Sequence, residues 1–266
     1  MRQIITDNNI KNAVNLWYYN KNKAIEIFGH ISEWDVSLVS NMSNLFRSKV
    51  NFNDDISNWD VSNVIDMSGI FNDARLFNQP LNNWNVSNVT NMGDMFYKAK
   101  SFNQPLNSWN VSNVTNMSYM FEGAESFNQN INTKNIINEN GSTYFAWDVS
   151  NVTNMSYMFY YAKSFNQPIA CWNISNVLAM TGMFSFAYSF NQDLSNWKIL
   201  LSNELINKST EIKEFELEKE CIICLNSEVN NYIIRMNCCG NNFHKICIIK
   251  WLDLNKSCPL CRVQFD

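Results

Sequence analysis

The chain has 266 residues, of which 46% are hydrophobic and 17% are charged, and its formal net charge is −4. Its length allows one elongated domain and a small second one. The composition argues against a nucleic-acid-binding protein, because no basic stripe occurs. It also argues against a membrane or secreted protein, because no apolar run reaches the ~18 residues that span a bilayer and the N-terminus lacks the apolar core of a signal peptide.

Residues 1–33 are expected to cap the segment that follows. Ile10, Val14, Trp17 and Tyr18 follow one another at steps of four, three and one, which places them on one face of a helix. Such a helix would shield the open end of the first repeat. His30 lies near this junction, and we expect a capping or surface histidine there.

Residues 34–197 repeat a single motif. Each block opens with a tryptophan, and the blocks begin at Trp34, Trp59, Trp84, Trp109, Trp147, Trp172 and Trp197. The spacing is 25 residues at five of the six steps and 38 at the other, which indicates an insertion at about 130–146 that we expect to be a surface loop. A fixed period of this size is typical of a solenoid, and six repeats are enough to bury a continuous core.

Each block has an apolar stripe. In the block from Trp84 the stripe falls at relative positions 0, 3, 6, 7 and 10: Val89, Met92, Met95, Phe96 and Ala99. This spacing predicts one buried face of a short helix, with Ser87 or Asn88 as its N-cap. Residues 102–106 are expected to form a brief strand. The asparagines at equivalent places are expected to line up and to hydrogen-bond the backbone of turns.

The recurring pattern W-[DN]-V-S-N-V-T-N-M-S-x-M-F…S-F-N-Q-P-L resembles the BspA-like leucine-rich-repeat family, also known as the DUF285 repeat of bacterial, protist and giant-virus proteins. The resemblance implies a right-handed α/β solenoid of about 25-residue repeats that offers a protein-binding surface. It does not name a ligand.

A polar, charged segment follows at residues 198–220. Five glutamates mark it: Glu211, Glu214, Glu216, Glu218 and Glu220. We expect a linker or an exposed helix that lets the last segment move relative to the repeats.

Residues 221–266 concentrate the metal-ligating side chains. They are Cys221, Cys224, Cys238, Cys239, His244, Cys247, Cys258 and Cys261. Two tetrahedral zinc ions need eight ligands, so this set would hold two ions. A set of disulfides is the alternative, but disulfides belong to oxidising compartments. The only other cysteine is Cys171, which we interpret as an unreactive thiol. A segment this small buries little on folding, and we expect it to be unfolded without zinc.

The segment from Cys239 to Leu252, followed by Cys258-Pro259-Leu260-Cys261-Arg262, resembles the RING domain of ubiquitin ligases. The resemblance implies two interleaved sites in a cross-brace. Site one would be Cys221, Cys224, His244 and Cys247, and site two would be Cys238, Cys239, Cys258 and Cys261. One departure concerns site two: most RINGs have a residue between their third and fourth ligands, and often a histidine where Asn241 stands. Either the backbone kinks so that Cys238 and Cys239 both bind, or site two keeps three ligands.

The resemblance also implies a surface for a ubiquitin-conjugating enzyme. Its matching positions are Ile223, Trp251 and Pro259, and Arg262 matches the cation that bridges ubiquitin and the conjugating enzyme. A RING ligase forms no covalent intermediate with ubiquitin and acts by positioning the charged conjugating enzyme.

The expected function is therefore that of a RING-type ubiquitin-protein ligase whose repeats recruit a protein substrate. The alternative is a non-enzymatic zinc-containing scaffold for protein interactions. Since ubiquitin is eukaryotic, we expect the protein in the cytoplasm or nucleus of a eukaryotic cell or of a virus-infected host. We expect a monomer, because only five residues follow Cys261. The sequence does not identify the substrate, the conjugating enzyme or the ubiquitin linkage.

Overall fold

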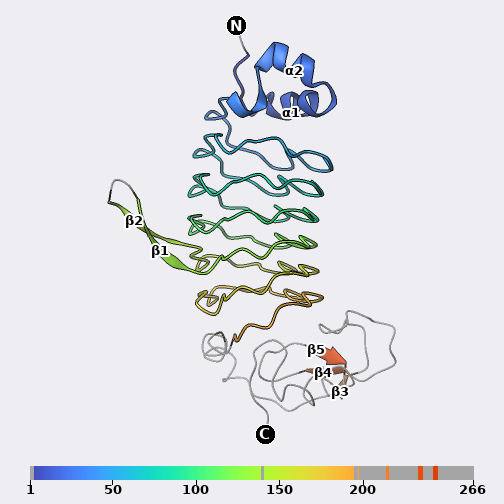
Figure 1. Ribbon diagram of the computed structural model, residues 1–266. Helices are drawn as coiled ribbons and strands as arrows, with labels where there is room; N and C mark the ends of the chain where they lie inside the picture. Colours follow the sequence, from blue (N-terminus) through green and yellow to red (C-terminus); the bar gives the residue numbers. More distant parts are fainter. Residues whose placement is uncertain are drawn as a thin grey trace.

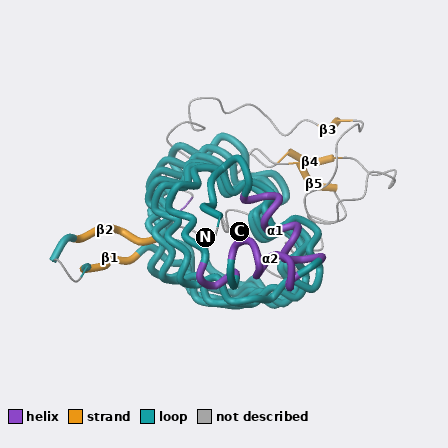
Figure 2. The backbone as a smooth tube through the Cα atoms, turned by 90° about the horizontal axis from the view of Figure 1, so that it is seen from above, coloured by secondary structure: helices purple, strands orange, loops and turns teal. Residues whose placement is uncertain are grey.

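The computed structural model describes residues 3–138, 141–194, 197, 214–215, 233–235 and 242–244. In it the repeats form successive coils stacked along one axis, with two helices at the N-terminal end and a β-hairpin that projects from one side (Figure 1). Figure 2 shows the same stack along its axis, where the coils superpose around a common interior. No helix among the described residues is long and apolar enough to cross a membrane.

The N-terminal helices are α1 (Ile10–Tyr19) and α2 (Lys21–Phe28), followed by the 3-10 turn η1 (Ile31–Glu33). The predicted helical face is confirmed, because Ile10, Val14 and Trp17 of α1 are buried against the first coils. The Trp17 Nε1 donates to the Asp54 carboxylate at 2.9 Å. The structure thus places a helical cap over the first repeat.

Asp7 completes this cap by accepting hydrogen bonds from the backbone of the first coil. In later coils the backbone N–H of Ile65 donates to Ser40 O, and the N–H of Thr90 donates to Ile65 O. The first coil has no preceding coil, and there the N–H groups of Ser40 and Asn41 both donate to Asp7 Oδ1 at 3.0 Å. A side-chain carboxylate therefore satisfies donors that a neighbouring backbone satisfies elsewhere.

The coils are joined by backbone hydrogen bonds between equivalent residues. Parallel bridges link one position of each coil to the next, in the order Asn41, Asp66, Asn91, Asn116, Asn154 and Ala179. Beyond each bridge, alternate N–H groups point to the following coil. In the third coil, Asp94 N donates to Ser118 O at 2.8 Å and Phe96 N donates to Met120 O at 2.8 Å.

The helix expected in each repeat is wrong, and these same hydrogen bonds explain why. The N–H groups that would bond four residues back in a helix bond the next coil instead, and those between them close tight turns, as when Tyr97 N donates to Asp94 O. Asp94 and Lys98 also have positive φ angles of 57° and 53°, which a right-handed helix does not allow. The brief strand expected at residues 102–106 is absent as well.

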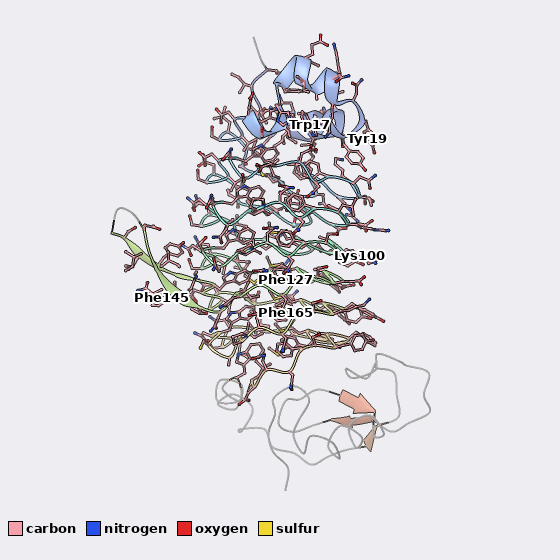
Figure 3. The ribbon with its side chains drawn as sticks, viewed as in Figure 1. Trp17, Tyr19, Lys100, Phe127, Phe145 and Phe165 are labelled. Atoms are coloured by element: carbon pink, nitrogen blue, oxygen red, sulfur yellow. The ribbon has the colours of Figure 1, made fainter. Side chains whose placement is uncertain are left out.

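The burial predicted for the apolar stripe is confirmed. Val89, Met92, Met95, Phe96 and Ala99 are all fully buried. Phenylalanines of successive coils stack, with the Phe96 ring centroid 5.5 Å from those of Phe71 and Phe121. A second column of phenylalanines stacks beside the first, and Figure 3 shows two of its members, Phe127 and Phe165, inside the stack with their ring centroids 6.1 Å apart. The tryptophan column is buried too. Its first six indoles, Trp34 to Trp172, each donate their N–H to a backbone carbonyl, as when Trp109 Nε1 donates to Leu81 O at 2.9 Å, whereas the buried Trp197 Nε1 has no partner among the described residues.

The asparagines line up as predicted. Asn88, Asn113 and Asn176 occupy one column, and each donates its side-chain amide to a serine carbonyl of the preceding coil at 2.7 Å. A second column accepts hydrogen bonds, as when Asn103 Oδ1 accepts from Asn128 N. The asparagines therefore tie neighbouring coils together at the surface while the aromatic rings do so inside.

The strands β1 (Lys134–Ile137) and β2 (Thr143–Ala146) form an antiparallel hairpin, with Lys134 opposite Ala146. The hairpin lies within the interval where the insertion is expected. Trp172 Nε1 donates to Ile131 O, and the equivalent bond in the coil before joins Trp147 to Leu106. Because the repeats are in register up to Ile131 and again from Trp147, the additional residues lie between them.

Three further strands lie near the C-terminus: β3 (Glu214–Phe215), β4 (Ile233–Arg235) and β5 (Asn242–His244). They form one antiparallel sheet in the order β3-β4-β5. Within residues 198–220, where a linker or exposed helix is expected, only Glu214 and Phe215 are described, and they pair with Ile234 and Ile233.

Candidate functional site

The zinc-ligand candidates lie almost entirely outside the described residues. Only the backbone of His244 is described, at the end of β5 and opposite Ile233 of β4. The seven cysteines of the set lie outside: Cys221, Cys224, Cys238, Cys239, Cys247, Cys258 and Cys261. So do Ile223, Trp251, Pro259 and Arg262. The structure therefore provides backbone pairing around one predicted ligand and leaves the ligand geometry as a prediction.

In the repeats, one face differs from the rest of the stack because its residues change from coil to coil. We call it the turn face: Asn44, Arg47 and Ser48 in the first coil and their equivalents in each later coil, as far as Gly182, Ser185 and Phe186 in the sixth. The tryptophan, valine and phenylalanine columns are nearly invariant because the core needs them. The side chains of the turn face are not so constrained, which leaves them available for binding.

The third and fourth coils place two half-buried carboxyl groups on this face, Asp94 and Glu122. Burial raises the pKa of Glu122 to about 7, against the opposing charge of Lys98 and with a further contribution from Asp94. Burial also raises the pKa of Asp94, although Arg47 opposes it. In both carboxyl groups, therefore, burial disfavours the charged form more than the nearby cations favour it.

The fourth to sixth coils place an aromatic patch beside these carboxyl groups. It consists of Tyr119, Tyr157, Tyr160, Tyr161, Phe186 and Tyr188. The rings form a connected series, with 5.0 Å between the centroids of Tyr119 and Tyr157 and 4.6 Å between those of Tyr161 and Phe186. Tyr188 is 71% exposed and Tyr161 is 36% exposed. Contiguous exposed aromatic rings are characteristic of surfaces that bind proteins.

A salt-bridge column borders the turn face. Glu125 lies between Lys100 of the preceding coil and Lys163 of the following one, at 2.8 Å and 2.7 Å. Hydrogen bonds from Lys100 and then Lys163 lower the pKa of Glu125. Figure 3 shows Lys100 on the side of the stack opposite the hairpin residue Phe145. The turn face and the hairpin therefore offer two separate surfaces.

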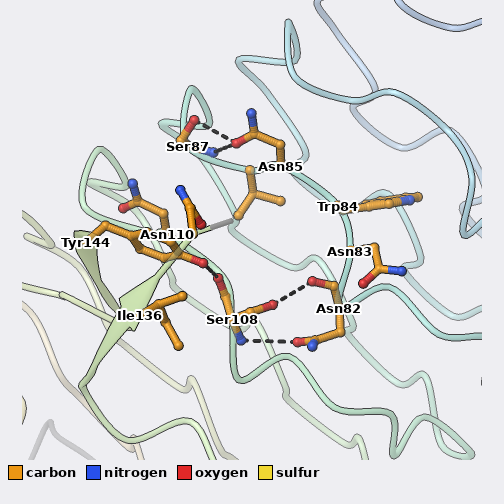
Figure 4. Close-up of a pocket in the computed structure, with 11 residues that line it drawn as sticks. Asn82, Asn83, Trp84, Asn85, Ser87, Ser108, Asn110, Ile136 and Tyr144 are labelled. Atoms are coloured by element: carbon orange, nitrogen blue, oxygen red, sulfur yellow. Dashed lines mark hydrogen bonds between the residues drawn. The ribbon is translucent and has the colours of Figure 1, made fainter. Parts of the chain in front are cut away.

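The hairpin surface contains a polar cavity of about 630 Å³ between β1, β2 and the second to fourth coils. Figure 4 shows Tyr144 and Ile136 of the hairpin opposite the asparagines of the coils, with the Tyr144 hydroxyl donating to Ser108 O. The side-chain oxygens of Asn85 and Asn110 are already used by Ser87 and Ser112. The cavity has neutral, hydrogen-bonding walls that suit a small polar ligand or a peptide backbone.

Comparisons with known proteins identify both parts of the chain. The family described as "Mycoplasma protein of unknown function, DUF285" matches residues 14–135 and 134–217, and the family described as "Ring finger domain" matches residues 219–262. The chain belongs to the DUF285 family. It joins DUF285 repeats to a C-terminal RING finger, which confirms the fusion predicted from the sequence.

Similar curated proteins share only the RING segment. E3 ubiquitin-protein ligase arkadia of Xenopus tropicalis is 39% identical over 56 residues, which are 21% of this chain and 6% of that protein. RING-H2 finger protein ATL78 of Arabidopsis thaliana is 39% identical over 66 residues, 24% of this chain and 30% of that protein. The chain thus spans less than a third of the length of these relatives. No solved structure matches the chain.

The RING match implies zinc, and the donor set fits that metal. Thiolates and imidazole are the ligands that zinc takes in structural sites, and residues 219–262 contain all seven cysteines and the histidine of the predicted set. The other histidine, His30, has a structural role as predicted, because its side chain accepts from Ser32 N at the start of η1. Cys171 is a free cysteine on the exposed surface.

The turn face was not predicted from the sequence as a site, although the sequence contains a signal for it. Aligning the seven tryptophans shows that these columns change between repeats, and the fold exposes some of their side chains, such as Arg47, Lys98 and Tyr161, while it buries others, such as Asn72 and Ser185. The cavity carries no such signal, because the hairpin that forms one of its walls interrupts the repeat.

Proposed function

We propose that this protein is a RING-type ubiquitin-protein ligase. Its RING finger would bind a conjugating enzyme already charged with ubiquitin, and its repeats would bring a target protein close enough for a target lysine to attack the thioester. The observation that carries this proposal is the Ring finger domain match at residues 219–262, supported by the relative named as an E3 ubiquitin-protein ligase. Catalysis would come from positioning, so no catalytic base is required in this chain.

Two zinc ions would hold the RING together. Site one would use Cys221, Cys224, His244 and Cys247, and site two would use Cys238, Cys239, Cys258 and Cys261. The ions would supply structure and no redox or Lewis-acid step, because tetrahedral sites filled by four protein ligands leave no open position.

The conjugating enzyme would dock on Ile223, Trp251 and Pro259. Arg262 would act on the reaction itself, because its planar guanidinium can donate to carbonyls of ubiquitin and of the conjugating enzyme together. These four residues lie within the matched segment 219–262. We propose that the protein works as a monomer in the cytoplasm or nucleus of a eukaryotic or virus-infected cell.

An in-vitro self-ubiquitination assay tests this function directly. Zinc-loaded full-length protein is incubated with ubiquitin, an activating enzyme and a panel of conjugating enzymes. Ile223→Ala should reduce ubiquitin-chain formation at least about tenfold, because it removes an apolar contact worth ~1–2 kcal/mol or more at an interface. Ile25→Ala, at an exposed position of α2 far along the sequence from the RING, is the matched control and should leave chain formation unchanged.

One sequence feature favours a second function, that of a non-enzymatic scaffold. Cys238 and Cys239 are adjacent, so site two depends on a backbone kink to use both thiolates. Two bound zinc ions per chain, together with no ubiquitin transfer across the panel, would select the scaffold. One bound zinc ion per chain would indicate that site two does not form, with the adjacent Cys238-Cys239 pair as the cause.

A further inference from the structure

The turn face has a local negative character around Tyr119. The charged groups that raise the pKa of this tyrosine, after burial, include Glu122 and Asp94, and both are acids. Lys98 and Arg47 lie near these two carboxyl groups but do not offset their burial, since both carboxyl pKa values stay raised. A further cation placed here would add to Lys98 and Arg47 and would favour the charged form of both carboxyl groups.

The same face already shows how it would hold a cation. The Lys98 ammonium lies over the ring of Tyr97, 4.7 Å from its centroid. Tyr119 stands in the next coil, and among the described residues no lysine or arginine lies over its ring. Stacking fixes this ring, since Tyr157 lies 5.0 Å away on a parallel plane. A tyrosine face beside carboxylates is a favourable place for an ammonium or guanidinium.

The position of Tyr157 depends on a glycine of the following coil. A Cβ at Gly182 would lie 2.7 Å from the Tyr157 ring, so this ring lies directly against the Gly182 backbone. Tyr157 is thus held between Gly182 and Tyr119. This packing restricts the Tyr157 and Tyr119 rings before a partner binds, which lowers the entropy that binding would cost.

We propose that the turn face binds a basic, partly apolar peptide segment of a partner protein. A lysine or arginine of that segment would lie against Tyr119 between Asp94 and Glu122, and an apolar residue beside it would cover Tyr161 and Phe186. This proposal rests on the proposed ligase function, for which the bound segment would belong to the protein that is ubiquitinated. Charge complementarity selects this occupant over an acidic or phosphorylated peptide, which Asp94 and Glu122 would repel.

The test is a selection from a random twelve-residue peptide library displayed on phage, with zinc-loaded full-length protein as the bait. Enriched peptides are synthesised with a fluorophore, and their affinities are measured by fluorescence anisotropy. We expect enriched peptides to contain lysine or arginine next to an apolar residue. Glu122→Gln should weaken their binding about tenfold, because it removes a charged partner, and Tyr119→Ala should weaken it about fivefold.

Two matched controls lie outside the turn face. Glu26→Gln removes the same charge from α2, and Tyr19→Ala removes a tyrosine that is 80% exposed on α1. Neither should change the affinity. Circular dichroism of Glu122→Gln and Tyr119→Ala, with melting of the repeats no lower than in the wild type as the criterion, separates loss of binding from loss of folding. A conservative Tyr119→Phe variant should retain binding, since it keeps the ring face.

Several outcomes would overturn the proposal: no enrichment, enriched peptides without basic residues, or equal affinity for the Glu122→Gln variant. Self-association that is lost in Tyr161→Ser would assign the aromatic patch to a second copy of the chain and would also overturn it. Ubiquitin transfer is read in a separate assay. If the protein forms ubiquitin chains but selects no basic peptide, the docking proposal fails and the proposed ligase function stands.

Discussion

The repeats and the RING segment achieve stability in opposite ways. Each coil of the repeats adds its own tryptophan, methionines and phenylalanines to a continuous core, and each coil is hydrogen-bonded to its neighbours. The RING segment of about 45 residues is expected to bury too little apolar surface to be stable without metal, and the proposed eight zinc ligands would supply the missing stability. The repeats therefore distribute their stability over many equivalent contacts, whereas the RING segment is expected to concentrate its stability in the bonds between zinc and its ligands.

Zinc removal should produce the largest effect and should separate the two regions. Chelation should unfold residues 221–263, because structural zinc contributes ~10–16 kcal/mol to such segments, while the repeats remain folded. Hydrogen exchange read by mass spectrometry, before and after chelation, would report on each region separately. Protection that persists in the RING segment after chelation would show that this segment stays folded without zinc.

A core substitution in the repeats should have the next largest effect. Phe96→Ala should lower the free energy of unfolding by ~3–5 kcal/mol, because it leaves a cavity between the stacked rings of Phe71 and Phe121. The adjacent Tyr97→Ala changes a ring on the turn face and should cost much less. Denaturant unfolding of both variants measures the contrast. Equal losses would mean that the turn face is as important to folding as the core.

A smaller effect is expected at the N-terminal end of the stack. Asp7→Ala should cost ~1–2 kcal/mol, because it leaves the N–H groups of Ser40 and Asn41 without their carboxylate acceptor. The loss should be confined to the first coil and should be visible as faster hydrogen exchange there. Asp35→Ala, whose carboxylate accepts only from Ser37 of its own turn, serves as the control. Faster exchange throughout the stack would show that the coils unfold as one unit.

The sequence predicts the repeats well because their period is set by burial. The 25-residue spacing locates the tryptophans, and the apolar stripe identifies which residues are buried. The local backbone is predicted wrongly, because a stripe at 0, 3, 6, 7 and 10 fits two consecutive tight turns as well as a helix. The deciding signal is in the columns of Asp94 and Lys98, where other coils have Gly69, Gly182 and Gly123, all with positive φ.

The candidate sites are predicted to different degrees for a similar reason. Spacing between cysteines identifies a zinc-binding segment because each ligand type is chemically specific, and the RING match agrees with it. The environment of Glu122 has no such marker. Its burial depends on how the side chains of neighbouring coils pack around it, and a single repeat read in isolation does not contain that information.

Glu122→Gln should have little effect on stability at low pH and an informative effect at high pH. The pKa of Glu122 is raised from 4.5 to about 7, so the folded protein retains a proton that the unfolded chain releases between these values. The contribution of Glu122 to stability is therefore fully present below about pH 4.5 and is lost as the pH rises through 7. The amide cannot ionise, so the variant should be more stable than the wild type at pH 8, with a smaller difference at pH 5.

Thermal melts of both proteins at these two pH values measure the effect, with Glu26→Gln as the control. Lys98, Asp94 and Tyr119 face Glu122 in both proteins, so their own contributions largely cancel in the difference. A variant less stable than the wild type at pH 8 would mean that the Lys98 charge outweighs the burial of Glu122. A variant that is more stable but binds the selected peptides more weakly would show that this carboxylate opposes folding and serves binding, as expected of a residue retained for a partner.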